Sequence, residues 1–133
     1  MNDANEKVLG VKRLPIFPLP LVLLPNELLP LHIFEPKYRQ MLSDIQLGNR
    51  LFGVSFFDGQ DTLSNEPPIG SIGCVAELIE AETLEDGRSN IVTTGVIRYE
   101  IESFFDSVEP YLVAEVSFFE DFAEDEKVLQ SLA

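Results

Sequence analysis

The sequence lacks most of the residues from which active centres are commonly built. Its 133 residues include one cysteine, one histidine and no tryptophan. A lone cysteine excludes an internal disulfide and is compatible with a reducing compartment. A lone histidine has no second histidine with which to complete a zinc site. The sequence also contains no Gly-x-Ser-x-Gly elbow and no glycine-rich phosphate loop of either common type, so the usual hydrolase and nucleotide-binding signatures are missing.

The reactive residue types that remain are weak candidates for catalysis. Cys74 has apolar neighbours and no histidine near it in sequence, so we expect a buried, unreactive thiol. His32 lies between two apolar residues of an extended segment, where we expect a structural role. Glu77, Glu80 and Glu82 recur along a predicted strand and indicate a solvated face. The sequence therefore predicts no catalytic residue, no metal ligand and no cofactor.

Basic residues are also scarce. The chain has nine lysines and arginines against 23 acidic residues, which gives a formal net charge of -14. Residues 1–57 hold six bases and five acids (+1), whereas residues 58–133 hold three bases and 18 acids (-15). Binding to nucleic acids and to anionic membranes depends on cations that neutralise phosphates. We therefore expect neither a nucleic acid nor a membrane as partner.

No apolar run is free of helix-breaking residues. Residues 14–34 are strongly apolar, but Pro15, Pro18, Pro20 and Pro25 interrupt them, and the polar residues Asn26 and Glu27 lie inside them. A membrane-spanning helix needs about 20 apolar residues in helical geometry, and proline breaks a helix interior. This pattern also differs from a secretory leader because no small-residue cleavage site follows it. We therefore expect a cytoplasmic protein.

The same prolines predict extended geometry at the start of the chain. Residues 13–19 and 28–34 are expected to be two extended segments around a turn at Pro25-Asn26. A helix is expected to begin at Pro36, because proline suits the first helical turn, and to end at Gly48-Asn49. Its buried face is expected to consist of residues spaced at i, i+3, i+4 and i+7, which are Tyr38, Met41, Leu42 and Ile45.

The rest of the chain has the alternation of strands. Strands are expected at 51–57, 72–83, 88–94 and 97–101, with a bend or bulge at Gly95 between the last two. A final strand is expected to present Leu112, Ala114, Val116 and Phe118 on one face. These elements predict a mainly β fold with one or two helices. Six or seven short strands would form an antiparallel meander closed into a small barrel, with one helix packed over an end.

We expect one folded domain with two flanking segments. Residues 1–12 are predicted to be a flexible arm, because they are polar and unpatterned. Residues 13–121 form the barrel domain. Residues 122–133 are predicted to begin a C-terminal helical segment that is truncated, since a helix over 124–133 would start just before the sequence ends.

Seven motifs follow one another along the chain. They are LPIFPL (14–19), LP (24–25), LPLHIFEPKYR (29–39), IGSIGCVA (69–76), DGR (86–88), TGVIRY (94–99) and PYLVAEV (110–116). In this order they resemble the N-terminal, substrate-binding domain of Lon protease, in the version found in stand-alone proteins. The resemblance covers residues 14–121 and implies a PUA-like pseudo-barrel. It also implies recognition of unfolded or damaged protein segments without catalysis, because the ATPase and Ser–Lys protease modules of Lon are absent from this chain.

The candidate contact residues fall into two groups. The first lies around the expected helix start and the second consists of the outward member of each adjacent phenylalanine pair. In the alternative interpretation, the glutamate caps the helix, the arginine makes a surface ion pair and the aromatic rings belong to the core. The candidates are Glu35, Tyr38 and Arg39 in the first group and Phe57, Phe105 and Phe119 in the second.

The expected function is that of a non-enzymatic binding module for unfolded or partly folded polypeptides. A protease or a chaperone is a candidate partner, and a monomer or a weak dimer is the expected state. Two alternatives stay open at this point: an RNA-binding PUA-like domain, which the net charge of -14 disfavours, and a regulatory or adaptor protein. A small enzyme is a third class, but no nucleophile–base pair supports it.

Overall fold

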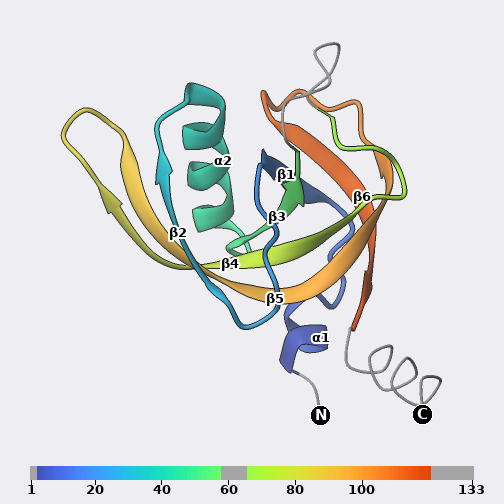
Figure 1. Cartoon of the computed structure of the whole chain (residues 1–133). Helices are drawn as coiled ribbons and strands as arrows, with labels where there is room; N and C mark the ends of the chain where they lie inside the picture. The colour runs from blue at the N-terminus through green and yellow to red at the C-terminus, as the bar shows by residue number, and fades with distance from the viewer. Residues whose placement is uncertain (1–2, 58–65, 121–133) are drawn as a thin grey trace.

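The computed structural model describes residues 3–57 and 66–120, which form two helices and six strands (Figure 1). The predicted helix over 124–133 lies outside the described residues. The elements are α1 (Asp3–Lys7), β1 (Leu14–Leu19), β2 (Leu28–Ile33), α2 (Pro36–Leu47), β3 (Leu51–Phe56), β4 (Ile72–Thr83), β5 (Ser89–Phe104) and β6 (Leu112–Phe119).

The six strands form one sheet that closes on itself. Their order is β2-β5-β4-β3-β1-β6, and a further pairing of β5 with β6 closes five of the strands into a barrel. Strand β2 lies outside this circuit and pairs with the first half of β5. The β-rich pseudo-barrel predicted from the sequence is thus confirmed. Its expected all-antiparallel meander is wrong, because β1 pairs with β3 in parallel.

Strand β5 is long enough to pair with strands of the barrel and also, through its first half, with β2 outside the barrel. The two strands predicted on either side of Gly95 are one strand, and the irregularity expected at Gly95 is confirmed. Cys74 pairs with Arg98, whereas Ala76 pairs with Gly95, so β5 carries one extra residue between these pairs. Such a bulge bends the strand and increases its twist. As Figure 1 shows, β4 and β5 extend as a hairpin well beyond the barrel.

The turn before β2 is docked onto this bulge. Asn26 has a φ of 72°, and its N–H donates to the Gly95 carbonyl at 2.9 Å. In return, the Gly95 N–H donates to the Glu27 carbonyl at 2.8 Å. A Cβ at Gly95 would overlap the carbonyl of Leu24, so only glycine allows the turn to approach this closely. This contact sets where β2 begins.

Helix α2 agrees with its prediction at both ends and on its buried face. Pro36 stands in its first turn, and Gly48 follows its last residue. The four residues expected on the apolar face are all buried. Figure 1 shows α2 standing between β2 and the β1–β3 pair. The helix thus covers the outer face of the barrel wall.

Two separate clusters of buried side chains result, because strands β1, β3 and β4 are covered on both faces. Leu51 and Phe52 are neighbours on β3, and both are buried, one in each cluster. The cluster inside the barrel, here called the barrel core, contains Val8, Leu14, Ile16, Leu51, Val75, Val96, Ile97, Tyr99, Ile101, Ala114 and Val116. The cluster beneath α2, here called the helix layer, contains Phe17, Leu23, Ile33, Tyr38, Met41, Leu42, Ile45, Phe52, Val54, Cys74, Ala76, Leu78, Ile91, Tyr111 and Val113.

Tyr99 is the largest side chain of the barrel core. Its hydroxyl lies 2.5 Å from that of Ser55, which is itself buried. A Cβ at Gly53 would lie 2.6 Å from the Tyr99 hydroxyl, and a Cβ at Gly73 would overlap its ring. The two glycines therefore make the space that the ring fills. Burial raises the pKa of Tyr99, which keeps its hydroxyl protonated.

The N-terminal residues differ from the flexible arm expected over 1–12. Helix α1 forms at Asp3–Lys7, and Val8 is buried within the barrel core. Lys7 Nζ also pairs with Glu77 Oε1 at 2.6 Å. Ala4 and Val11 also pack against the barrel core. Three small apolar residues in an otherwise polar segment are too few for the sequence pattern to predict this packing.

Candidate functional site

The helix layer opens to solvent at the start of α2. The opening, here called the α2 groove, has a volume of about 310 Å³. Strand β1, the end of β2, the first turn of α2 and the residue after β3 all contribute to it. Most of its lining is apolar, as is typical of binding clefts. The lining residues are Phe17, Pro18, Leu19, Leu31, His32, Phe34, Glu35, Lys37, Tyr38 and Phe57.

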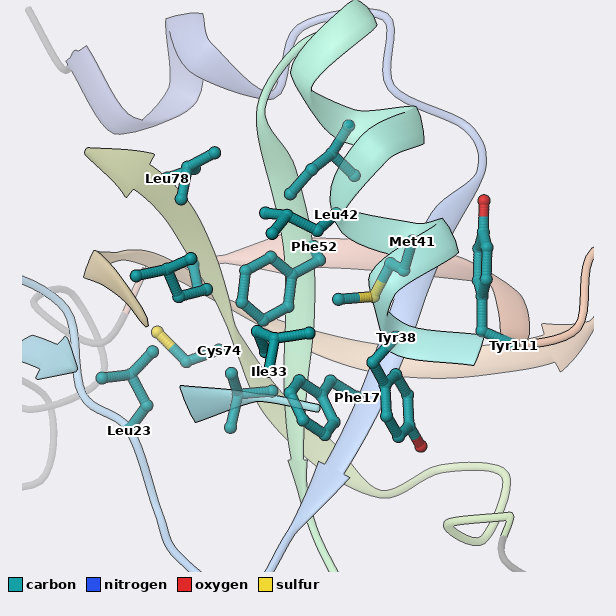
Figure 2. Packing of buried hydrophobic residues seen from close by; sticks show 14 of the residues in the cluster. Phe17, Leu23, Ile33, Tyr38, Met41, Leu42, Phe52, Cys74, Leu78 and Tyr111 are labelled. Atoms are coloured by element: carbon teal, nitrogen blue, oxygen red, sulfur yellow. The ribbon is translucent and has the colours of Figure 1, made fainter. Parts of the chain in front are cut away.

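Two stacked rings form the floor of the groove. The centroids of Phe17 and Tyr38 lie 4.0 Å apart with 26° between the ring planes. Figure 2 shows both rings at the edge of the helix layer, with the Tyr38 hydroxyl directed away from it. Burial, together with the negative charge of Glu35, raises the pKa of Tyr38 to about 12. The floor is therefore uncharged at physiological pH.

One side of the groove carries an exposed aromatic ring. Phe34 is 56% exposed and stacks on His32, with 6.0 Å between the ring centroids. His32 Nδ1 lies 2.7 Å from Asn90 Oδ1. Because an amide oxygen only accepts, Nδ1 is the donor in this bond. Because the Phe34 ring is exposed and stacks on His32, a ligand can contact it directly.

The first turn of α2 places the two predicted charged candidates differently. The Glu35 carbonyl accepts from the Tyr38 and Arg39 N–H groups at 3.0 and 2.9 Å, whereas its side chain makes no capping bond. Instead of capping the helix, the Glu35 side chain lines the groove, as does Lys37. Arg39 lies outside the groove lining. Its Nε donates to the Phe34 carbonyl at 3.0 Å, and its guanidinium faces Gly87 in the β4–β5 turn.

The phenylalanine pairs are not all oriented as expected. Phe57 is half-buried and lines the groove, whereas its neighbour Phe56 is the outward member at 50% exposure. Phe105 lies beneath the Arg13 guanidinium, 4.8 Å from the ring centroid, and is 37% exposed. Phe119 is half-buried and lies 5.7 Å from the Arg98 guanidinium. The structure thus brings Glu35, Tyr38 and Phe57 together and leaves the other three candidates elsewhere.

A second hollow adjoins the groove through Tyr38 and Lys37 and has a volume of about 360 Å³. Phe105 is part of its lining. On the same side of α2, Tyr111 donates from its hydroxyl to Asp44 Oδ2 at 2.5 Å. Burial and this bond raise the pKa of Tyr111. The bond holds the segment before β6 against the helix.

Several groove residues escaped the sequence analysis, most clearly Phe34 and Lys37. A signal for Phe34 was available. On β2, Leu28, Pro30 and His32 are exposed and alternate with less exposed residues, and Phe34 continues the same alternation. The pattern over 28–34 predicts an extended segment, but it does not predict which face of that segment stays uncovered.

Neither a metal-holding cluster nor a membrane-spanning helix occurs among the described residues. Within 3–57 and 66–120, no three His, Cys, Asp or Glu side chains lie where they could hold a metal ion. No helix of the same residues is both long and apolar enough to cross a bilayer. Cys74 is fully buried, as the sequence predicted.

The closed barrel, the helix on its outer wall and the apolar groove define a small β-rich pseudo-barrel domain. The chain belongs to the family of the ATP-dependent protease La (LON) substrate-binding domain, whose family model matches residues 13–133. The resemblance seen in the sequence motifs is thereby confirmed.

Curated relatives include two Lon proteases. The protein from Flavobacterium johnsoniae is 30% identical over 117 residues, which are 86% of this chain. The protein from Cytophaga hutchinsonii is 32% identical over 116 residues, which are 84% of this chain. In both cases the match spans only 14% of the relative's length.

Two solved structures share the fold. A Lon N-terminal domain protein from Xanthomonas campestris is similar with a TM-score of 0.66 and 27% identity, covering 83% of this chain and 61% of that one. The N-terminal domain of a Mycobacterium avium complex Lon protease has a TM-score of 0.63 and 16% identity, covering 91% and 67% respectively. The second comparison supports the fold alone.

Proposed function

We propose that the chain is a non-enzymatic substrate-recognition module that binds unfolded or partly folded polypeptide segments in the α2 groove. The observation that carries the proposal is the groove itself, an apolar cleft with an exposed ring at Phe34, in a chain of the substrate-binding family. Unfolded chains expose the large apolar side chains that native proteins bury. An apolar cleft of about 310 Å³ suits one such side chain at a time.

The two curated relatives are proteases, and the chain matches only a small part of each. We therefore propose that the chain delivers or holds polypeptides for a protease or a chaperone partner, in a reducing compartment such as the cytoplasm. The single buried thiol is compatible with that compartment. The two charged residues on the groove rim, one of each sign, leave the groove without a strong preference for charge.

Binding to a labelled unstructured peptide tests the proposal. The peptide carries one phenylalanine in a glycine–serine background, and fluorescence anisotropy reports its affinity. We expect Phe34→Ala to weaken binding about tenfold, because the ring would be buried by the ligand. The unfolding free energy should change by less than about 0.5 kcal/mol, because the ring is largely exposed in the free protein.

The matched control is Leu47→Ala at the other end of α2. Leu47 is 88% exposed and lies outside the groove lining, so its removal should leave affinity unchanged. Absence of peptide binding at high micromolar concentration would refute the proposal. Tight binding of an RNA oligomer at low salt would instead favour the RNA-binding alternative.

A further inference from the structure

A larger hollow lies on the sheet face next to the α2 groove. It has a volume of about 890 Å³ and lies over the ribbon formed by β2, β5 and β4. We call it the acidic hollow, because its lining contains two glutamates and neither lysine nor arginine. The lining residues are Pro30, Leu31, His32, Glu80, Ala81, Glu82, Asn90, Ile91 and Val92.

Cross-strand pairing places the acidic and apolar residues in rows. Pro30 pairs with Val92, and Val92 pairs with Glu80, so these side chains share one face of the ribbon. The next row consists of His32, Asn90 and Glu82. Each row therefore runs from Pro30 or His32 on β2 to a carboxylate on β4. Glu80 and Glu82 are both exposed, so a ligand on the ribbon can reach them.

The cations nearest this face in sequence are already engaged. Arg88 Nε bonds to Asp86 Oδ2 at 2.6 Å. Arg39 reaches the same turn from α2 and donates to a backbone carbonyl. Neither arginine lines the acidic hollow. The two glutamates consequently give this face a negative potential.

The acidic hollow and the α2 groove share two lining residues, Leu31 and His32 on β2. Phe34, which lines the α2 groove, stacks on His32. A polypeptide held in the α2 groove would thus meet the acidic hollow as soon as it crossed β2.

We propose that the acidic hollow selects lysine or arginine residues that flank the apolar residue bound in the α2 groove. The occupant is an extended, unfolded segment that combines a large apolar residue with nearby basic residues. This inference rests on the proposed function and specifies its substrate class. The distance from β2 to β4 across the sheet is two strand spacings, or about 10 Å. An extended chain covers this distance in about three residues. A basic residue three positions from the apolar one is therefore in register with Glu82.

The expected preference is modest and depends on salt. Exposed charge pairs are individually weak, and two of them would give a three- to tenfold preference for a basic over a neutral flank. The preference should be largest at low ionic strength and disappear in about 0.5 M salt, where the screening length falls to a few ångströms. Affinity for a neutral peptide should change little with salt.

Three labelled peptides test the inference on the full chain. Each has one phenylalanine in a glycine–serine background, with lysine, glutamine or glutamate placed three residues to either side. We expect the affinity order lysine, glutamine, glutamate in 50 mM salt. The double variant Glu80→Gln/Glu82→Gln should bind the lysine and glutamine peptides equally and should keep the wild-type affinity for the glutamine peptide.

A control variant with the same charge change is Glu102→Gln/Glu115→Gln. These glutamates accept from Ser117 and Ser103 on the β5–β6 pair and do not line the acidic hollow. The control should retain the preference for lysine. Equal affinity of the wild-type protein for all three peptides would overturn the inference while leaving the proposed function intact, and so would loss of the preference in both double variants. Failure of every peptide to bind would overturn both proposals.

Discussion

The barrel core and the helix layer share the strands β1, β3 and β4 but differ in how they are closed. The barrel core is enclosed by five paired strands, and its one hydroxyl pair, Tyr99–Ser55, is buried. The helix layer is covered by one helix and one additional strand. It opens beside Tyr38 into the α2 groove and a second hollow. A sheet closed on itself leaves no edge through which a ligand can enter, whereas a helix laid on a sheet leaves gaps at its ends.

The two clusters therefore have different roles in the fold. The barrel core holds the strands in register, and the helix layer offers the surfaces that a polypeptide can reach. Substitutions in the barrel core should therefore act on stability, and those around the start of α2 on binding. The following predictions test that division, beginning with the largest expected effect.

Gly73→Ala should be the most damaging small substitution in the barrel core. The added Cβ would meet both the Tyr99 ring and the Val54 carbonyl oxygen, the latter at 2.6 Å. Neither can move without shifting a paired strand, so we expect a loss of about 3 kcal/mol in unfolding free energy. Urea denaturation followed by circular dichroism measures it.

Gly48→Ala is the control for this prediction. A Cβ there would lie 3.6 Å from the nearest atom, the Asp44 carbonyl oxygen, so the expected change is within about 0.5 kcal/mol. If the two substitutions cost the same, the barrel core would have more space than its geometry indicates.

Removing a tyrosine hydroxyl should cost more in the barrel core than in the helix layer. Tyr99→Phe leaves the buried Ser55 hydroxyl without its partner, for which we expect about 2 kcal/mol. Tyr111→Phe frees the Asp44 carboxylate, which is only partly buried and can be hydrated, so about 1 kcal/mol is expected. Urea denaturation of both variants gives the comparison, and a larger loss for Tyr111→Phe would reverse it.

Raising the pH above 10 should reduce the contribution of Tyr38 in the helix layer to the unfolding free energy. The folded-state pKa of Tyr38 is raised from 10.0 to about 12, so its contribution to stability is complete below pH 10. It is then lost as pH rises from 10 towards 12. Because Tyr38 borders two open hollows, solvent weakens the effect, and we expect at most about 1 kcal/mol of loss by pH 11.

Comparison with Tyr38→Phe isolates this contribution from those of Tyr99 and Tyr111. The stability difference between wild type and variant should be constant from pH 7 to 9 and shift in favour of the variant by pH 11. A constant difference up to pH 11 would show that the Tyr38 hydroxyl titrates as it does in the unfolded chain.

Local features of the fold could be predicted from the sequence, and long-range ones could not. The start of α2 at Pro36, its buried face and the irregularity at Gly95 all follow from backbone restrictions or a short periodicity. The parallel pairing of β1 with β3 does not, because alternation shows which side chains share a face but not which strand lies alongside. Helix α1 was missed for a related reason, since its anchors are tertiary contacts: the packing of Ala4 and Val8 on the barrel core and the Lys7–Glu77 ion pair.

The candidate site was predicted in part. Glu35 and Tyr38 came from the motif at the helix start, and both line the α2 groove. The choice of outward ring in the Phe56–Phe57 pair could not be predicted, because β3 ends there. The Phe57 N–H donates to the Leu19 carbonyl at 2.8 Å, which keeps Phe57 beside β1 and at the groove.

By itself, the sequence determined the β-rich class, the extended proline-containing segments near the start of the chain, the helix at Pro36 and the family. Each of these depends on residue order and on the torsion angles that neighbouring residues allow. Only the tertiary structure decided that the sheet has two buried faces, that one of them opens at α2, and that Glu80 and Glu82 line a hollow that shares Leu31 and His32 with that opening. Those relations join residues far apart in the chain, and they are set by strand closure and side-chain packing rather than by local preference.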